Sequence, residues 1–126
     1  MTEDEKFISE GRAAIFKAIA HPSRIFMVEK LGEKPHCVCE LADMIGIDQS
    51  TASKHLSILK NAGLINDDKK GTTVYYSLKC RCILEFIWCI EDVIRMNLER
   101  STRYLYPVKE IKKEEKYVTS EAGRNT

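Results

Sequence analysis

The chain has 126 residues, which is enough for one domain and too few for two ordinary ones. Its residues are 44% hydrophobic and 31% charged, a balance that predicts a buried core and excludes a disordered chain. The net charge is only +1, but residues 48–81 hold six lysines and arginines against three aspartates, a modest electrostatic footprint for contact with phosphates.

Apolar spacing and capping residues predict four helices in the first half of the chain, over about residues 5–20, 22–31, 37–45 and 48–61. Pro22 suits the first turn of the second helix, and residues 32–35 are expected to form a loop. Gly46 is a helix stop, and Asp48 is a good N-cap for the fourth helix.

The second half predicts a hairpin and one long helix. A strand begins at Leu64, residues 67–71 are expected to form a polar turn, and residues 72–78 alternate as a second strand. The fifth helix runs from about Lys79 to beyond Leu98, with more than one apolar stripe. A second subunit is the expected cover for this helix, and the alternative is a central helix that is wholly buried in the monomer. We expect one domain over residues 1–106 and a charged, flexible tail over residues 107–126.

The two short helices that flank Gly46 and Asp48 form a predicted helix-turn-helix, and the hairpin is a predicted wing. The fold class is therefore mostly α with a β-hairpin wing, a winged helix-turn-helix that dimerises through its terminal helices. Small polar and basic side chains on the exposed face of the fourth helix suit the major groove of double-stranded DNA. Lys69 and Lys70 at the wing can contact phosphates. The alternative is that these polar side chains only face water.

The chain has five cysteines, an odd number that is unlike a secreted disulfide scaffold. The acidic first residues MTEDEKF are unlike a secretory signal. No apolar run approaches the roughly 18 residues that span a bilayer. We therefore expect a cytoplasmic protein with no membrane partner, in which clustered thiols bind metal or sense redox state.

Cys37 and Cys39 are expected at the start of the third helix. Side chains two residues apart on a helix point about 200° apart, so one ion would bind both sulfurs only if the first turn unwound. That unwinding would displace the helix-turn-helix. A helix N-terminus should also lower the thiol pKa. The alternative is that both cysteines are small buried hydrophobes, and the neighbouring His36 is expected to be a solvated loop residue.

The stretch CVCELADMIGIDQSTASKHLSILKNAGLINDDKKGTTVYYSL resembles the ArsR/SmtB family of metal-responsive repressors. The resemblance covers about residues 10–100 and implies a winged-helix homodimer on a palindromic operator. The DNA-contacting residues that it implies are Gln49, Ser50, Ser53, Lys54, His55, Lys69 and Lys70. The spacing of His55 also fits a packed histidine at the edge of the helix.

The metal site that the resemblance implies is incomplete. Arsenic and antimony sensors of the family resemble this chain at Cys37 and Cys39, but their third cysteine falls on Ala42 here. Zinc sensors place two ligands at Cys80 and Cys82, while their later two fall on Val93 and Met96. The implied metal ligands are therefore Cys37, Cys39, Cys80 and Cys82.

We therefore expect a repressor that leaves its operator when cysteine thiolates bind As(III), Sb(III), Cd(II) or Pb(II), with no organic cofactor. Cys37 and Cys39 would be completed by a thiol from Cys80, Cys82 or Cys89, including one from the other subunit. The alternatives are a thiol redox or persulfide sensor on the same fold, and a protein-interaction module. An enzyme is not expected, because the chain has no Gly-rich phosphate loop and no paired acid and base at useful spacing.

Overall fold

The structure, a computed structural model, describes residues 1–102. The predicted domain boundary at residue 106 and the predicted tail lie outside the described residues. The chain divides into two compact units, residues 1–80 and residues 81–126. The first unit contains α1 (Glu3–Ile19), α2 (Pro22–Glu33), β1 (His36–Cys37), α3 (Val38–Ile45), α4 (Gln49–Asn61), β2 (Ile65–Lys70) and β3 (Thr73–Leu78). The described part of the second unit is α5 (Cys82–Thr102).

Capping residues set the helix boundaries in the first unit. The Nδ1 atom of His21 accepts a hydrogen bond from the Ser23 amide at 3.0 Å, and Pro22 follows as the first residue of α2. Gly46 ends α3 in the left-handed conformation at φ 85°, and the Asp48 carboxylate accepts from the Thr51 amide at 2.7 Å to begin α4. The four predicted helices are confirmed, although α2 continues to Glu33 through part of the expected loop.

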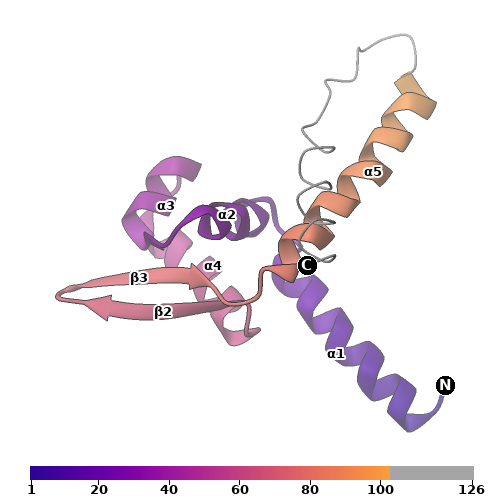
Figure 1. Ribbon diagram of the computed structural model, residues 1–126, viewed down its shortest axis with the longest axis horizontal. Helices are drawn as coiled ribbons and strands as arrows, with labels where there is room; N and C mark the ends of the chain where they lie inside the picture. The colour runs from indigo at the N-terminus through magenta and orange to yellow at the C-terminus, as the bar shows by residue number, and fades with distance from the viewer. Residues whose placement is uncertain (103–126) are drawn as a thin grey trace, which may run out of the picture. The chain divides into compact units, whose positions relative to one another are not determined.

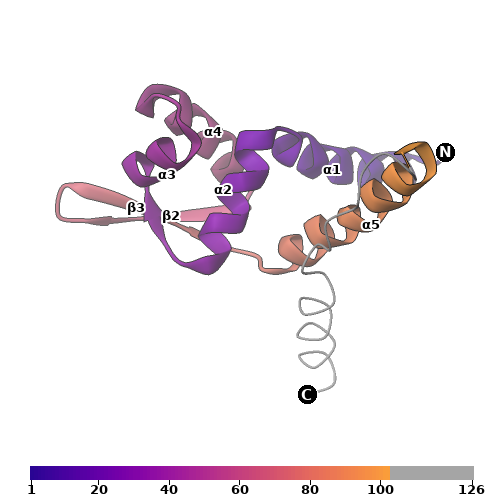
Figure 2. The same cartoon turned by 90° about the horizontal axis from the view of Figure 1, so that it is seen from above.

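The sheet has three antiparallel strands in the order β1-β3-β2. β1 was not predicted: its two residues pair with β3, His36 opposite Tyr76 and Cys37 opposite Tyr75. The predicted polar turn over residues 67–71 is wrong, because β2 stays paired with β3 as far as Lys70. Gly71, at φ 66°, supplies the left-handed conformation that the short turn requires. The result is a long hairpin that extends away from the helices of its unit (Figures 1 and 2).

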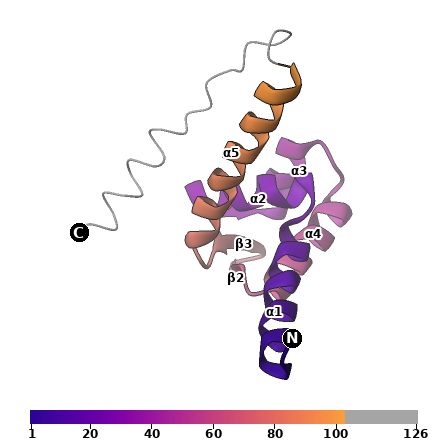
Figure 3. The same cartoon turned by 90° about the vertical axis from the view of Figure 1, so that its right-hand side faces the viewer.

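The core of the first unit lies among the helices and the base of the hairpin. Figure 3 shows the N-terminal part of α1 running beyond the other elements of this unit, and Phe7 near that end is 78% exposed. The largest fully buried side chains are Met27, Val28, Leu41, Leu56 and Leu59. Because α2, α3 and α4 each contribute to this set, the helix-turn-helix is held by the same apolar interior as the rest of the unit.

Leu56→Ala is expected to lower the free energy of unfolding by about 2–5 kcal/mol, since the leucine is fully buried and its removal leaves a cavity. Ile58→Ala on the same helix is the matched control, because Ile58 is 43% exposed and should cost much less. Urea unfolding at one fixed protein concentration would compare the two variants. Equal losses would contradict the packing described for α4.

α5 begins later than predicted, at Cys82 rather than near Lys79. Cys80 therefore precedes the helix, and Cys82 is its first residue. None of the helices within residues 1–102 has the length and apolar character needed to cross a bilayer. α5 leaves an apolar set partly exposed: Phe86, Ile90, Val93, Ile94, Met96 and Leu98.

Candidate DNA-binding surface and thiol pair

α4 presents two chemically different faces. Ala52, Leu56 and Leu59 are fully buried, as their three- and four-residue spacing predicts. The opposite face is exposed and carries Gln49, Ser50, Ser53 and Lys54. The structure thus brings four of the five predicted α4 contact residues together on one solvent-facing strip, with hydroxyl, amide and ammonium groups that can hydrogen-bond base edges and phosphates.

His55, the fifth predicted contact residue on α4, is not part of this exposed strip and lies against Arg24 and His21. Its side chain is half-buried, and its Nδ1 atom lies 3.0 Å from an Arg24 guanidinium nitrogen. Its ring centroid is 4.4 Å from that of His21. The alternative that the sequence left open, a packed histidine at the helix edge, describes this environment.

The wing is joined to α4 by one ion pair. The Lys60 ammonium lies 2.8 Å from the Asp67 carboxylate, between the last turn of α4 and β2. The hydrogen bond raises the pKa of Lys60 and lowers the pKa of Asp67. Both groups are partly exposed, so the pair fixes geometry more than it adds stability.

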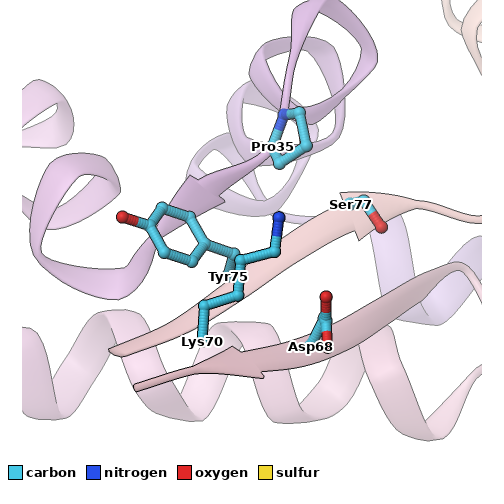
Figure 4. A pocket seen from close by; sticks show the side chains of 5 residues that line it. All are labelled: Pro35, Asp68, Lys70, Tyr75 and Ser77. Atoms are coloured by element: carbon cyan, nitrogen blue, oxygen red, sulfur yellow. The ribbon is translucent and has the colours of Figure 1, made fainter. Parts of the chain in front are cut away.

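A shallow hollow of about 470 Å³ lies on one face of the sheet. Its lining residues are Pro35, Asp68, Lys70, Tyr75 and Ser77. Figure 4 shows the Lys70 side chain lying across this face toward β3, with its nitrogen between Tyr75 and Ser77. Lys70 is exposed, and because side chains alternate along a strand, Lys69 lies on the other face of β2.

Cys37 and Cys39 lie closer together than the sequence predicted. Their sulfur atoms are 2.7 Å apart, because Cys37 is the N-cap residue of α3 and has an extended backbone at ψ 168°. The expectation that the first turn must unwind before both sulfurs can meet is therefore wrong. Cys37 is buried and Cys39 is exposed, so the pair has one side open to solvent.

The expectation of a lowered thiol pKa is also wrong for Cys37. Burial, together with the hydrogen bond to the Cys39 thiol, raises the pKa of Cys37 to about 11. The Cys37 thiol also donates to the Glu40 carboxylate at 3.2 Å. Helix N-terminal position alone does not decide thiol acidity when the sulfur is out of water.

His36 is a core residue rather than a solvated one. Its side chain is only 4% exposed, and its Nδ1 atom lies 2.8 Å from the second oxygen of Glu40. This hydrogen bond is the largest cause of the lowered pKa of Glu40. Within the described chain the His36 Nε2 atom has no hydrogen-bond partner. Glu40 thus bridges His36 and Cys37, a link that the sequence pattern did not predict.

Cys80, one of the second pair of predicted metal ligands, lies apart from Cys37 within the first unit. Tyr75 is opposite Cys37, and Leu78 at the end of β3 is already roughly 10 Å further along the strand before the chain reaches Cys80. Cys82 and Cys89 belong to the second unit, and Cys80, Cys82 and Cys89 are all exposed. Residues 1–102 contain no group of three or more His, Cys, Asp or Glu side chains arranged to hold a metal ion.

Comparison with known proteins identifies the family. Residues 21–67 match the bacterial regulatory proteins of the arsR family. The chain is 35% identical over 85 residues to MJ1325 of Methanocaldococcus jannaschii, an uncharacterised HTH-type transcriptional regulator, and the match covers 67% of this chain and 96% of MJ1325. This chain belongs to the arsR family. The resemblance noted from the sequence is thereby confirmed, and the family is one of bacterial transcriptional regulators of the HTH type.

Two further relatives of this arsR-family protein have more specific names. The chain is 38% identical over 71 residues to the HTH-type transcriptional repressor SmtB of Mycobacterium tuberculosis, covering 56% of this chain and 53% of SmtB. It is 42% identical over 67 residues to a cadmium resistance transcriptional regulatory protein, a CadC homolog of Staphylococcus aureus, covering 52% of this chain and 55% of that protein. The chain thus spans just over half the length of these two relatives.

Solved structures confirm the winged helix-turn-helix fold of this arsR-family protein. The crystal structure of NolR from Sinorhizobium fredii has a TM-score of 0.69 and 25% identity, and covers 74% of this chain and 93% of NolR. The homodimeric winged helix-turn-helix DNA-binding domain of Mb0332 from Mycobacterium bovis has a TM-score of 0.68 and 24% identity, and covers 81% of this chain and 94% of that domain. The latter likeness concerns the fold alone.

Proposed function

We propose that this arsR-family protein is a homodimeric transcriptional repressor that releases its operator when a soft metal or metalloid ion binds Cys37 and Cys39. The observation that carries the proposal is the 2.7 Å sulfur pair at the N-cap of α3, the helix that packs against α4. The names of SmtB, a repressor, and of the CadC homolog, a cadmium resistance regulator, support it.

The DNA-binding half of the proposal assigns the exposed strip of α4 to the major groove. Gln49, Ser50, Ser53 and Lys54 would contact bases and nearby phosphates, and Lys69 and Lys70 would contact the flanking backbone. A palindromic operator needs two copies of α4 related by a twofold axis. The partly exposed apolar residues of α5 supply a surface that a second copy would cover.

Cys37 and Cys39 fit a soft ion but supply only two of its ligands. Two thiolates suit As(III), Sb(III), Cd(II) or Pb(II), which prefer sulfur and take a third ligand. We assign that ligand to a thiol of Cys80, Cys82 or Cys89, with one from the second subunit allowed. Cys82 and Cys89 are seven residues apart on one helix, about 10 Å by helix rise, so one ion cannot join both within a chain.

Ion binding would act on α4 through α3. Because Cys37 ends β1 and is the N-cap residue of α3, an ion held by its sulfur would act directly on the start of the helix-turn-helix. α3 packs against α4, so the strip that contacts DNA moves with it.

The decisive experiment measures binding of the reduced protein to its own upstream DNA, alone and with As(III), Sb(III), Cd(II), Pb(II) or Zn(II). The expected result is tight binding without metal and release by one of the first four ions at stoichiometric amounts. Specific DNA binding that no metal alters would contradict the effector half of the proposal. Absence of specific binding would contradict the whole of it.

The short sulfur separation also favours a second candidate, a thiol redox or persulfide sensor. An oxidant such as hydrogen peroxide would take two electrons and two protons from the thiols, forming a Cys37–Cys39 disulfide and two waters. Release by peroxide with no effect of any metal would favour this candidate. Release by a metal under reducing conditions would exclude it as the sole mechanism.

Lys69→Ala with Lys70→Ala is expected to weaken binding to operator and random DNA alike, because lysine contacts with phosphate carry no sequence information. The slope of log Kd against log salt should shrink by about 0.9 for each phosphate that the variant no longer neutralises. Titrations at four salt concentrations measure that slope. Lys6→Ala, an exposed lysine on α1, is the control. An unchanged slope in the wing variant would remove these lysines from the interface.

A further inference from the structure

Arg24 joins three elements of the first unit. Its Nε donates to the carbonyl oxygen of Ala18 at 2.6 Å, and a second nitrogen lies 3.5 Å from the carbonyl oxygen of Lys17. Its third contact is His55 Nδ1 on α4, at 3.0 Å. A guanidinium is a rigid fork of donors that keeps its charge at all ordinary pH values. One side chain of α2 therefore connects the last turn of α1 to the helix that is proposed to contact DNA.

This geometry fixes the protonation state of His55. Arginine can only donate, so Nδ1 of His55 must accept, and the ring is neutral with its proton on Nε2. The adjacent ring of His21 has its own Nδ1 occupied as an acceptor from the Ser23 amide. Burial, and then the nearby His21 and Arg24, lower the pKa of His55. Lys17 and Lys54, the charged residues next in sequence to Ala18 and His55, are exposed.

We propose that His55 is a positioning residue for α4 rather than a base-contacting one: its neutral Nδ1 anchors the helix to Arg24, and operator binding weakens when the ring is protonated. This inference rests on the proposed function, since it concerns how the DNA-binding strip is held. A protonated ring could no longer accept from Arg24 and would place two cations in contact. The anchor between α4 and the ends of α1 and α2 would then be lost.

The sign of the pH effect separates this role from a simple charge effect. An additional positive charge on a DNA-binding helix would by itself strengthen binding to phosphates as the pH falls. The anchor between His55 and Arg24 predicts the opposite, namely that operator binding weakens as the pH falls. If only the neutral form is competent, Kd rises by up to about tenfold per subunit for each pH unit below the pKa of His55. The unfolded chain binds this proton more readily, so stability also falls as the pH drops below about 6.5.

The test compares operator binding of the wild-type protein and His55→Asn between pH 7.5 and pH 5.5. The asparagine carbonyl can replace Nδ1 as the acceptor for Arg24, but it does not titrate and does not reach the position of Nε2. We expect affinity within about threefold of wild type at pH 7.5 and loss of the acid sensitivity. His55→Leu, which has no acceptor, should bind weakly at every pH. A base-contacting His55 would instead make His55→Asn lose affinity and selectivity at one base pair, which would overturn the proposal.

His21→Asn is the matched control, because asparagine keeps the cap on the Ser23 amide and removes only the second ring. It should remain acid-sensitive, and loss of the effect there would assign the response to His21 instead. Nitrogen-15 chemical shifts of the His55 ring give a readout that does not depend on folding of a variant: an unprotonated Nδ1 is expected in the free protein, and a protonated one would refute the anchor. Wild-type protein that binds no operator at any pH would refute the proposed function itself, whereas operator binding that strengthens on acidification would refute only this inference.

Discussion

Cys37→Ser combined with Cys39→Ser is expected to bind the operator as tightly as the wild-type protein and to stay bound when metal is added. The sulfurs of these residues lie 2.7 Å apart at the start of α3, so one ion can reach both of them. None of the proposed base and phosphate contacts involves them. Fluorescence anisotropy of labelled operator DNA, titrated with As(III) or Cd(II), measures both halves of the expectation.

Three variants make this result interpretable. Cys39→Ser alone changes an exposed thiol and should leave folding intact while greatly weakening the metal response, even if Cys37, which is buried, proves sensitive to substitution. Cys89→Ser, and Cys80→Ser combined with Cys82→Ser, change the other exposed thiols and test which of them supplies the predicted third ligand. Release of the Cys37 and Cys39 double variant by the same metal concentration as wild type would remove this pair from the site.

The response should also depend on pH in a defined direction. Because the pKa of Cys37 is about 11, this thiol is protonated at neutral pH and must lose its proton to become a ligand. Metal binding then tightens by up to about tenfold per pH unit for each thiol proton released. Half-release should therefore require less metal at pH 8 than at pH 7.

Local signals in the sequence account for most of the fold. His21, Pro22, Gly46 and Asp48 mark helix ends through their own backbone preferences and hydrogen bonds, and these effects act within a few residues. β1 has no such signal. Its two residues become a strand only because they pair with residues of β3 almost forty positions later. The polar run in β2 looks like a turn because both of its faces are exposed over most of its length.

The sequence predicts residues for the candidate site, and their roles stay predictions, but it does not predict the geometry around several of them. The exposed strip of α4 follows from helical periodicity, since its position opposite Leu56 requires no tertiary information. The environment of His36 depends on its burial in the core. The environment of His55 depends on Arg24, a partner on another helix and 31 residues away in the sequence. The distance between the two sulfurs depends on the extended backbone of Cys37, which is both the last residue of β1 and the N-cap of α3. Helical periodicity describes residues within a helix, whereas this pair lies at the N-terminal end of one.

Ser53→Ala with Lys54→Ala is expected to abolish specific operator binding while the protein still folds and dimerises. Both side chains are exposed in the middle of the strip on α4, so their removal leaves no cavity and no buried group without a partner. Each good base contact contributes about 1–3 kcal/mol of discrimination against a wrong base pair. In a twofold dimer each substitution removes the contact from both half-sites. Anisotropy with operator and scrambled DNA measures the specific and non-specific parts, and sedimentation measures assembly.

Ser9→Ala with Lys6→Ala is the matched control for this variant, because it removes one serine and one lysine that are exposed on α1. It should bind the operator like wild type. If both double variants bind operator normally, α4 does not contact DNA, and the surface assigned here to base contact is only a solvated helix face. If the α4 variant loses operator DNA and retains scrambled DNA, the two side chains contribute to sequence recognition as well as to charge, because a uniform weakening of phosphate contacts would affect both DNAs in parallel.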